Sequence, residues 1–305
     1  MFGAGATGSL FAARLSGAGH DVLAIGRAAH VQAIARDGLV VEGVRPGVFH
    51  LAAAEALDGT FPPDVVLLAV KAFDLAQAAR ATAGATRAPV PTLLPQNGLG
   101  ISAIAEEGLR AGGWVHPVLL RAIHSVPATW LGPGRVRQAG EGEFVLPETV
   151  VPAAAPWIGL VEAMGFPVRR APDFEREVWR KLLVNAAINP VTADHGIVNG
   201  QLRQDPWRGQ ALALLGEART VAAAEGHPVD AATAEADLWR VVGATAENRS
   251  SMLQDLDHGR PTEIEAISGA LLRAGARHGL SLPATQRAWD RIVAQAARHR
   301  APKPS

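Results

Sequence analysis

Three polar side chains with the spacing of a helical stripe lie in an otherwise apolar stretch of this chain. Lys181, Asn185 and Asn189 are four residues apart, so at about 100° per residue they share one face of a helix. The residues between them are apolar, which predicts a buried helix whose polar groups need partners. An ammonium group beside amides can stabilise and protonate an oxygen that gains negative charge. The alternative is a core helix whose amides bond to neighbouring backbone. Pro190 follows directly and predicts that the helix ends or kinks there.

Lysine is rare in this chain, which gives Lys181 further weight. Of the 29 basic residues only three are lysine, Lys71, Lys181 and Lys303, and the last lies in a terminal tail. Arginine does not release its proton in a protein, whereas a lysine with a lowered pKa does. Cysteine and tyrosine are absent, so the other available proton donors are His, Asp and Glu. Lys181 is therefore a candidate general acid.

Length and charge narrow the class of protein. A chain of 305 residues suits two domains, and 29 acidic residues balance 29 basic ones. The balance argues against a nucleic acid or an anionic membrane surface as partner. Apolar runs fall short of the roughly 20 residues that span a bilayer, so we expect no membrane span and a cytoplasmic protein. The histidines lack paired spacing and cysteine is absent, so we expect no metal site.

The chain begins with a glycine motif typical of dinucleotide binding. Gly3, Gly5 and Gly8 form G-x-G-x-x-G, a helical pattern follows, and Asp21–Ile25 has the pattern of a strand. This order predicts a β-α-β unit whose helix begins at a bound pyrophosphate. The strand before the glycines is expected to have about five residues, but only Met1 and Phe2 are present. Either the start of the strand is clipped, or the strand is unusually short.

Three polar residues follow predicted strands, at the edge where open α/β sheets bind ligands. Arg27 stands where an NAD site usually places an acidic residue, which favours the 2′-phosphate of NADP(H), although Arg27 also fits a surface position. Lys71 follows the buried strand predicted over Asp64–Val70. Asn97 follows a further predicted strand, although its Asn-Gly dipeptide is also an ordinary turn.

The later part of the chain changes in character. Residues 114–147 contain short strands and Gly/Pro turns, which we interpret as an antiparallel margin of the same sheet. Helical patterns follow near 155–164 and then throughout the chain from Asp173. The expected fold is therefore an α/β Rossmann-type dinucleotide-binding domain over residues 1–170, followed by an all-α domain over residues 171–305.

A polar segment at 247–265 belongs to the helical domain. Ser251 with Gln254, and Thr262 with Glu265, match the capping box that begins a helix. Glu263 in the first turn of the second helix fits a simple interaction with the helix dipole. The number of polar residues in this segment exceeds what two caps require.

These motifs together resemble the ketopantoate reductase family over nearly the whole chain. The matching blocks are Gly3-Ala-Gly-Ala-Thr-Gly8, Val70-Lys71, Gln96-Asn-Gly98, residues 179–193, Asn199-Gly-Gln-Leu202, residues 250–255 and Gly259-Arg-Pro-Thr-Glu-Ile264. Both lysines outside the tail and all five asparagines fall on positions that the family uses for cofactor or substrate. The resemblance implies a helical domain like the C-terminal domain of 6-phosphogluconate dehydrogenase.

The resemblance also implies an activity, the NADPH-dependent reduction of 2-dehydropantoate to (R)-pantoate in pantothenate and coenzyme A synthesis. The implied cofactor residues are Gly3, Ala4, Gly5, Ala6, Thr7, Gly8, Arg27 and Lys71, with Asn97 where nicotinamide and substrate meet. Lys181 is implied as the catalytic acid, and Glu263 as an acidic residue that helps catalysis or cofactor placement. The implied substrate contacts are Asn97, Lys181, Asn185, Asn189, Asn199, Asn248 and Ser251.

Other interpretations remain open at this point. The 114–130 segment, with His116 and His124, departs from the family pattern, and another 2-oxo acid is an alternative substrate. A non-catalytic NADP-binding sensor would need the glycine motif but no proton donor. His195 beside the amides is an alternative base, although a His next to Gly196 is more often a cap or surface residue. A monomer and a homodimer fit the sequence equally well.

Overall fold

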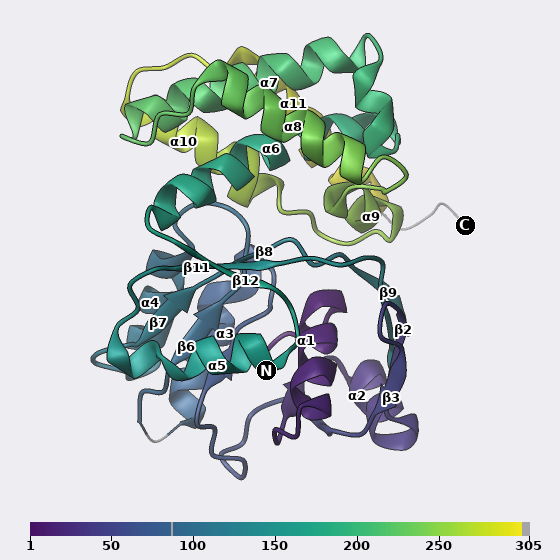
Figure 1. Ribbon diagram of the computed structural model, residues 1–305, viewed down its shortest axis with the longest axis vertical. Helices are drawn as coiled ribbons and strands as arrows, with labels where there is room; N and C mark the ends of the chain where they lie inside the picture. The colour runs from purple at the N-terminus through teal and green to yellow at the C-terminus, as the bar shows by residue number, and fades with distance from the viewer. Residues whose placement is uncertain (87, 301–305) are drawn as a thin grey trace. The chain divides into compact units, whose positions relative to one another are not determined.

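The structure, a computed structural model, describes residues 1–86 and 88–300 of the chain (Figure 1). Lys303 lies outside the described residues. Contacts divide the chain into two compact units. The first comprises Met1–Gln96 and Gly100–Phe174, and the second comprises Asn97–Leu99 together with the chain from Glu175 onward. Mixed α/β structure in the first unit and helices in the second confirm the expected fold class.

A parallel sheet organises the first unit. Its strands are β1 (Leu23–Ile25), β4 (Ala52–Ala54), β5 (Val66–Leu67), β6 (Thr92–Leu94) and β7 (Leu119–Arg121). Pairing runs β4-β1 on one side and β5-β6-β7 on the other, and Phe2 bridges the two parts through parallel contacts with Ile25 and Leu68. Counted along the chain from Phe2, this is the order 3-2-1-4-5-6 of dinucleotide-binding sheets.

Phe2 alone takes the place of the central strand. Its N–H donates to the Leu67 carbonyl at 2.8 Å, and its own carbonyl accepts from the Ala69 N–H at 2.6 Å. The amine of Met1 donates to the Leu23 carbonyl at 3.0 Å, and burial lowers its pKa to about 5. The first strand is therefore short in the structure, yet it still delivers the chain to the glycine motif at the centre of the sheet.

Helices join these strands. They are α1 (Ala6–Gly17), α2 (Ala28–Asp37), α3 (Leu75–Ala85), α4 (Ile101–Ala111) and α5 (Pro156–Ala163), with 3-10 turns at Ala72–Asp74 and Pro152–Ala154. The helix predicted near 155–164 is confirmed as α5. Leu10 and Phe11 of α1 are fully buried in the core of this unit, so the helix that begins at the glycine motif is held by its apolar side.

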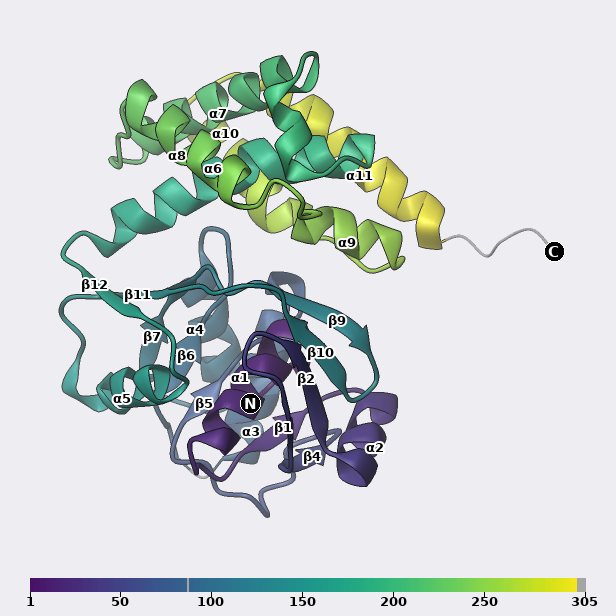
Figure 2. The same ribbon diagram turned by 45° about the vertical axis from the view of Figure 1, so that its right-hand side comes forward.

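Of the strands within residues 114–147, β7 joins the parallel sheet, and the others form two further sheets with strands from elsewhere in the chain. The strands of these two sheets are β2 (Leu39–Gly43), β3 (Gly47–Phe49), β8 (Ile123–His124), β9 (Ala128–Gly132), β10 (Arg135–Gln138), β11 (Phe144–Pro147) and β12 (Val168–Ala171). One sheet has the order β3-β2-β10-β9 and the other β12-β11-β8, and Figure 2 shows α1 beside the first. The margin prediction is wrong because β10 pairs in parallel with the distant β2, a long-range choice that local pattern does not reveal.

The second unit is helical. Its elements are α6 (Phe174–His195), α7 (Trp207–Ala224), α8 (Ala231–Ala244), α9 (Ser251–Asp257), α10 (Ala270–Arg277), α11 (Pro283–Arg300), a 3-10 helix at Asn199–Arg203 and a π-helix at Glu265–Gly269. One continuous apolar core joins them. In the described part of the chain, no helix is both long enough and apolar enough to cross a membrane.

Helix α6 runs through Pro190 and ends at His195, so the prediction that the helix ends at Pro190 is wrong. A proline inside a helix costs about 3 kcal/mol, but Pro190, Val191, Thr192 and Ala193 are all buried. The Thr192 hydroxyl lies 2.8 Å from the Ile188 carbonyl and 2.7 Å from the Ser250 hydroxyl. Packing of the last turn therefore offsets the hydrogen bond that Pro190 removes.

A buried histidine ties the first unit together. The Gly134 N–H donates to Nδ1 of His30 at 2.8 Å, so the ring proton is on Nε2, which lies 2.9 Å from the Ser9 hydroxyl. The ring also packs 4.5 Å from Trp130. Burial lowers the pKa of His30 from 6.5 to about 4. His30 therefore joins α1, α2 and the β9–β10 turn in its neutral form.

This histidine predicts acid-sensitive stability. Between pH 6.5 and pH 4 the unfolded chain binds a proton at His30 that the folded chain does not, so the free energy of unfolding falls as pH falls through this window. We expect the contribution of His30 to drop by about 2 kcal/mol between pH 7 and pH 5. Urea unfolding at both pH values should show that His30→Gln removes this part of the pH dependence. A parallel loss of stability in parent and variant would contradict the assignment.

Candidate functional site

The glycine motif forms a tight backbone cradle at the start of α1. Gly3 has φ +92°, and a Cβ there would lie 2.6 Å from the Val70 nitrogen. A Cβ at Gly8 would lie 2.1 Å from the Gly3 carbonyl oxygen, so this glycine lets α1 pack against the loop. Gly5, directly before α1, has nothing within 4 Å of a built Cβ. One glycine makes the turn, one lets the helix pack, and one leaves open space for a ligand, as in pyrophosphate sites.

The electrostatics of this cradle favour an anion. The first turn of α1 contains Ala6 and Thr7 and has no acidic side chain. No local negative charge therefore weakens the positive end of the helix dipole, where the N–H groups of the first turn have no partner within the helix. Ala4 is buried within the loop. The cradle therefore presents backbone rather than side chains, which suits a phosphate group.

Two cations follow the strands on either side of the cradle. Arg27 is an exposed residue at the start of α2, directly after β1, and its guanidinium has no hydrogen-bond or ion-pair partner among the described residues. Lys71 follows β5 and precedes the 3-10 turn at Ala72–Asp74. Because Phe2 lies between β1 and β5 in the sheet, both residues share the carboxyl edge of the sheet with the glycine motif. This edge can hold a nucleotide with several phosphates.

The polar stripe predicted on α6 is the least buried part of that stretch. Between residues 181 and 193 every residue is buried except Lys181 and Asn185, which are partly exposed. Asn189, the third member, is buried with 6 % of its surface exposed. The helix is therefore apolar and buried as predicted, and it opens along the side that bears an ammonium group and an amide.

An ion pair fixes the rotation of α6. The Arg180 guanidinium donates through Nε and Nη2 to the two oxygens of Asp237 on α8, at 2.8 and 2.9 Å. These hydrogen bonds raise the pKa of Arg180. Burial pushes the pKa of Asp237 upward, but hydrogen bonds from Arg180 and Arg240 outweigh it and hold the pKa below its usual value. Because Lys181 is the next residue along the chain, this clamp also sets the direction in which Lys181 projects.

Asn199 and Asn248 are neighbours in the structure. The Asn199 N–H donates to the Asn248 carbonyl at 2.9 Å, and the Asn199 side-chain amide donates to the Thr245 hydroxyl at 2.9 Å. The side-chain oxygen of Asn199 is buried and has no partner among the described residues. The side chain of Asn248 is exposed. This pair therefore offers one exposed amide and one buried acceptor that can take a hydrogen bond.

Ser251 is not the cap of its helix, which corrects the first capping prediction. Ser250 caps α9, because its hydroxyl accepts from the Leu253 N–H at 3.2 Å. Contact with the Thr192 hydroxyl buries Ser250 and favours it for this role over its neighbour. Ser251 is exposed as the first residue of α9, so its hydroxyl is not occupied by capping.

Glu263 lies before an irregular helix. It is buried, with 8 % of its surface exposed, and its carbonyl accepts from the N–H groups of Ala266 and Ile267 at 3.0 and 3.1 Å. The π-helix Glu265–Gly269 follows, and such turns are frequent at functional sites. The predicted capping by Thr262 and Glu265 is wrong, because the Glu265 carboxylate instead accepts from Trp289 at 2.9 Å.

Asn97 belongs by its contacts to the helical unit, although the chain on both sides belongs to the first unit. Its side-chain oxygen is buried, and no described residue bonds to it. Gln96, one residue earlier, remains with the sheet, because its side-chain amide donates to the Val70 carbonyl at 3.1 Å.

The structure groups the predicted residues in two sets. The first unit holds Gly3, Ala4, Gly5, Ala6, Thr7, Gly8, Arg27 and Lys71, and the second holds Asn97, Lys181, Asn185, Asn189, Asn199, Asn248, Ser251 and Glu263.

His195 has a structural environment. It is exposed at the end of α6, beside Gly196 with φ +66°, and its Nε2 lies 2.9 Å from the Gln210 side-chain oxygen. The Asp194 carboxylate is 3.6 Å from the same nitrogen. The bonding to Gln210 favours the interpretation of His195 as a helix-end residue.

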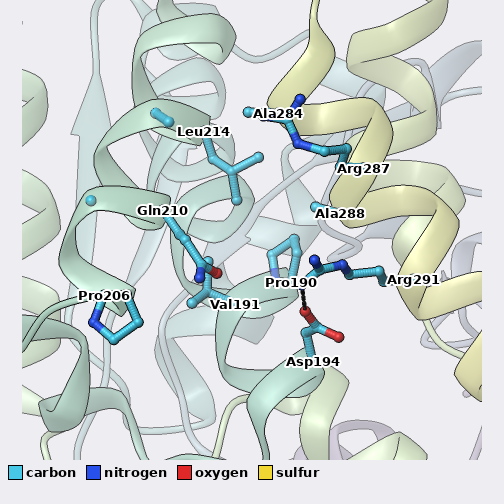
Figure 3. Close-up of a pocket in the computed structure, with 12 residues that line it drawn as sticks. Pro190, Val191, Asp194, Pro206, Gln210, Leu214, Ala284, Arg287, Ala288 and Arg291 are labelled. Atoms are coloured by element: carbon cyan, nitrogen blue, oxygen red, sulfur yellow. Dashed lines mark hydrogen bonds and ion pairs between the residues drawn. The ribbon is translucent and has the colours of Figure 1, made fainter.

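A cleft in the helical unit lies beside α6 (Figure 3). It has a volume of about 360 Å³ and is lined by α6, α7 and α11, with Asp194 bound to Arg291 at 2.8 Å. Pro190, Val191 and Asp194 line it from α6. At about 100° per residue these positions lie roughly 120° to 180° around the helix from Asn185, the middle residue of the stripe. The cleft is therefore separate from the polar stripe.

The whole chain matches known proteins. Residues 1–150 match the family model described as ketopantoate reductase PanE/ApbA, and residues 173–296 match the model of its C-terminal part. A 2-dehydropantoate 2-reductase of Archaeoglobus fulgidus is 33 % identical over 92 % of this chain and 91 % of that protein. One of Vibrio cholerae is 32 % identical over 96 % of this chain and 95 % of that protein.

A solved structure shares the arrangement. The PanE/ApbA family ketopantoate reductase of Ralstonia eutropha JMP134 is 28 % identical, with a TM-score of 0.88, and the alignment covers 99 % of this chain and 100 % of that one. The two family models together span both structural units of the present chain. The resemblance drawn from the glycine motif, the lysines and the asparagines is thereby confirmed, and the chain belongs to the ketopantoate reductase family of oxidoreductases.

Proposed function

We propose that this protein catalyses the NADPH-dependent reduction of 2-dehydropantoate to (R)-pantoate, a step of pantothenate synthesis, with Lys181 as proton donor. Family membership and relatives named 2-dehydropantoate 2-reductase support this activity. The observation that carries the proposal is the partly open stripe of Lys181 and Asn185 on the otherwise buried α6. If these side chains served only packing, we would expect them to be buried like the rest of the helix.

The first unit fits NADPH. The glycine cradle has the open space and free backbone N–H groups that a pyrophosphate needs. Arg27, with no competing partner among the described residues, suits the 2′-phosphate, and Lys71 adds positive charge on the other side of the cradle. When bound, NADPH supplies a hydride to C2 of the substrate.

In this proposal Lys181 stabilises the negative charge that forms on the substrate oxygen when the hydride reaches C2. As C2 of the 2-oxo acid is reduced, its oxygen becomes an alkoxide, and the Lys181 ammonium stabilises this oxygen and then gives it a proton. The product is the 2-hydroxy acid, and Lys181 regains its proton from solvent. Asn185 and Asn189 hold the neighbouring oxygens of the substrate through their amides.

The remaining polar residues of the helical unit complete the substrate site in this proposal. Asn199 contributes the buried oxygen that lacks a partner among the described residues, and Asn248 and Ser251 contribute exposed polar groups. We assign Asn97 to both substrate and cofactor, and Glu263 to catalysis or cofactor placement. NADPH oxidation with a panel of 2-oxo acids tests the proposal. Preference for another acid would replace the substrate, and no turnover with tight NADPH binding would favour a sensor.

Alanine substitutions of Lys181 and Lys71 should impair different steps, turnover in the first case and NADPH binding in the second. Lys181→Ala should lower kcat/KM by about 10²- to 10⁴-fold, because proton transfer to the alkoxide is lost, while the Kd of NADPH stays near that of the parent. Lys71→Ala should mainly raise the Kd of NADPH. Steady-state kinetics with NADPH fluorescence titration separate the two effects. Turnover of Lys181→Ala within a few-fold of the parent would end the proton-donor role.

Arg27 should decide the cofactor. Loss of a charged hydrogen-bonding partner of a phosphate costs about 1.5–3 kcal/mol, so Arg27→Ala should raise the Kd of NADPH by about 10- to 100-fold and change that of NADH little. Arg36→Ala is the matched control, since Arg36 is an exposed arginine on the same helix that pairs with Asp37. Equal effects on NADPH and NADH would remove the 2′-phosphate assignment.

Gly5 should be needed for binding but not for folding. Its Cβ would enter open space and its φ is −84°, so Gly5→Ala should fold normally while its methyl group obstructs the pyrophosphate. We expect a rise of about 10-fold or more in the Kd of NADPH. Gly84→Ala, whose methyl group also meets nothing within 4 Å, should bind NADPH like the parent. Unchanged binding in Gly5→Ala would place the pyrophosphate elsewhere.

A further inference from the structure

The tripeptide Asn97–Leu99 contacts the helical unit closely. Gly98 is buried, and a Cβ at this position would lie 2.6 Å from the Ala266 carbonyl oxygen and 3.2 Å from the Ala266 Cβ. Leu99 packs against the apolar core of the helical unit. The tripeptide therefore belongs to the second unit by backbone approach and by side-chain packing, although residues before and after it belong to the first.

Only glycine permits this approach. Gly98 has φ +98°, a region that side chains rarely adopt, and the nearest atom is a backbone oxygen that cannot rotate away. That oxygen belongs to the π-helix Glu265–Gly269, which begins two residues after Glu263. Gly98, the neighbour of Asn97, therefore contacts the π-helix that follows Glu263.

The chain passes between the two units at both ends of the tripeptide, and the residues at these ends allow it to do so. Before it, the Gln96 side chain bonds to the segment that follows β5, donating to the Val70 carbonyl at 3.1 Å. After it, Gly100 has φ +71°, is exposed and has nothing within 4 Å of a built Cβ. The chain is therefore bonded to the first unit just before the tripeptide, and just after it the chain turns back at a glycine with no close neighbours.

We propose that Gly98 is a positioning residue that holds Asn97 on the helical unit. Asn97 then keeps its place relative to Lys181, whatever the first unit does. The inference rests on the proposed function, because it places Asn97 with the residues that bind the 2-oxo acid. It also assigns the amide of Asn97 to the substrate side of the reaction, so that the substrate residues form one body.

Stability tests the contact directly, whether or not the protein reduces a 2-oxo acid. Gly98→Ala and Gly100→Ala both place alanine at positive φ, but only the methyl group of Gly98→Ala meets a backbone oxygen, at 2.6 Å. We expect the urea midpoint of unfolding to fall more in Gly98→Ala than in Gly100→Ala, because only Gly98 packs on the π-helix.

Equal falls of the urea midpoint in the two variants would overturn the inference, because they would show that the tripeptide does not rest on the π-helix. If the parent reduces no 2-oxo acid, the proposed function fails, and the comparison of the two midpoints still tests the contact.

A pair of alanine variants separates positioning from backbone strain. Gly98→Ala and Gly100→Ala both place alanine at positive φ, but only Gly98→Ala meets a backbone atom at 2.6 Å. We expect Gly98→Ala to raise KM for the oxo acid by about 10- to 100-fold, as misplacement by about 1 Å does, with the Kd of NADPH within about 2-fold. Gly100→Ala should keep the KM of the parent. Equal KM values in the two variants, or a change confined to NADPH binding, would contradict the inference.

Discussion

The two-point ion pair between Arg180 and Asp237 is the interaction on which the arrangement of the helical unit depends. Helix α6 is apolar on nearly every side, so hydrophobic contacts alone resist its removal from the core but only weakly define its rotation. A planar guanidinium that meets both oxygens of one carboxylate allows a single orientation. The partly open side of α6 therefore bears Lys181 and Asn185 rather than an apolar residue.

Much of the fold and of the site could be predicted because the signals are local. The spacing of Gly3, Gly5 and Gly8 encodes a tight turn, a close approach to the ligand and a packing contact, and the structure has all three in that order. The spacing of Lys181, Asn185 and Asn189 depends only on the helical period, which packing preserved. Phe2 takes the place of the central strand because its N–H and carbonyl bond to Leu67 and Ala69, while the adjacent Met1 carbonyl and Gly3 N–H bond to Ile25 on the other side.

The failures share one physical cause, which is contact between residues far apart in the sequence. Pro190 is a local helix breaker, yet burial of the following turn overrides it. Ser250 rather than Ser251 caps α9 because Thr192 lies beside it. Strands β8 to β11 lie outside the parallel sheet because β2 and β12 offer partners. The attachment of Asn97 to the helical unit depends on Ala266, 169 positions later in the printed numbering, and no local pattern carries that information.

The adjacent cations Arg180 and Lys181 show why the chain departs from its preference for arginine at one position. The role of Arg180 requires a rigid fork that stays charged, and its hydrogen bonds to Asp237 raise its pKa further. A lysine there would offer a single ammonium to the carboxylate and would define the rotation of α6 less well. The role proposed for Lys181 requires a group that can give up a proton, which an arginine would not do. Exchanging the two residues would therefore keep the net charge and lose both the clamp and the acid.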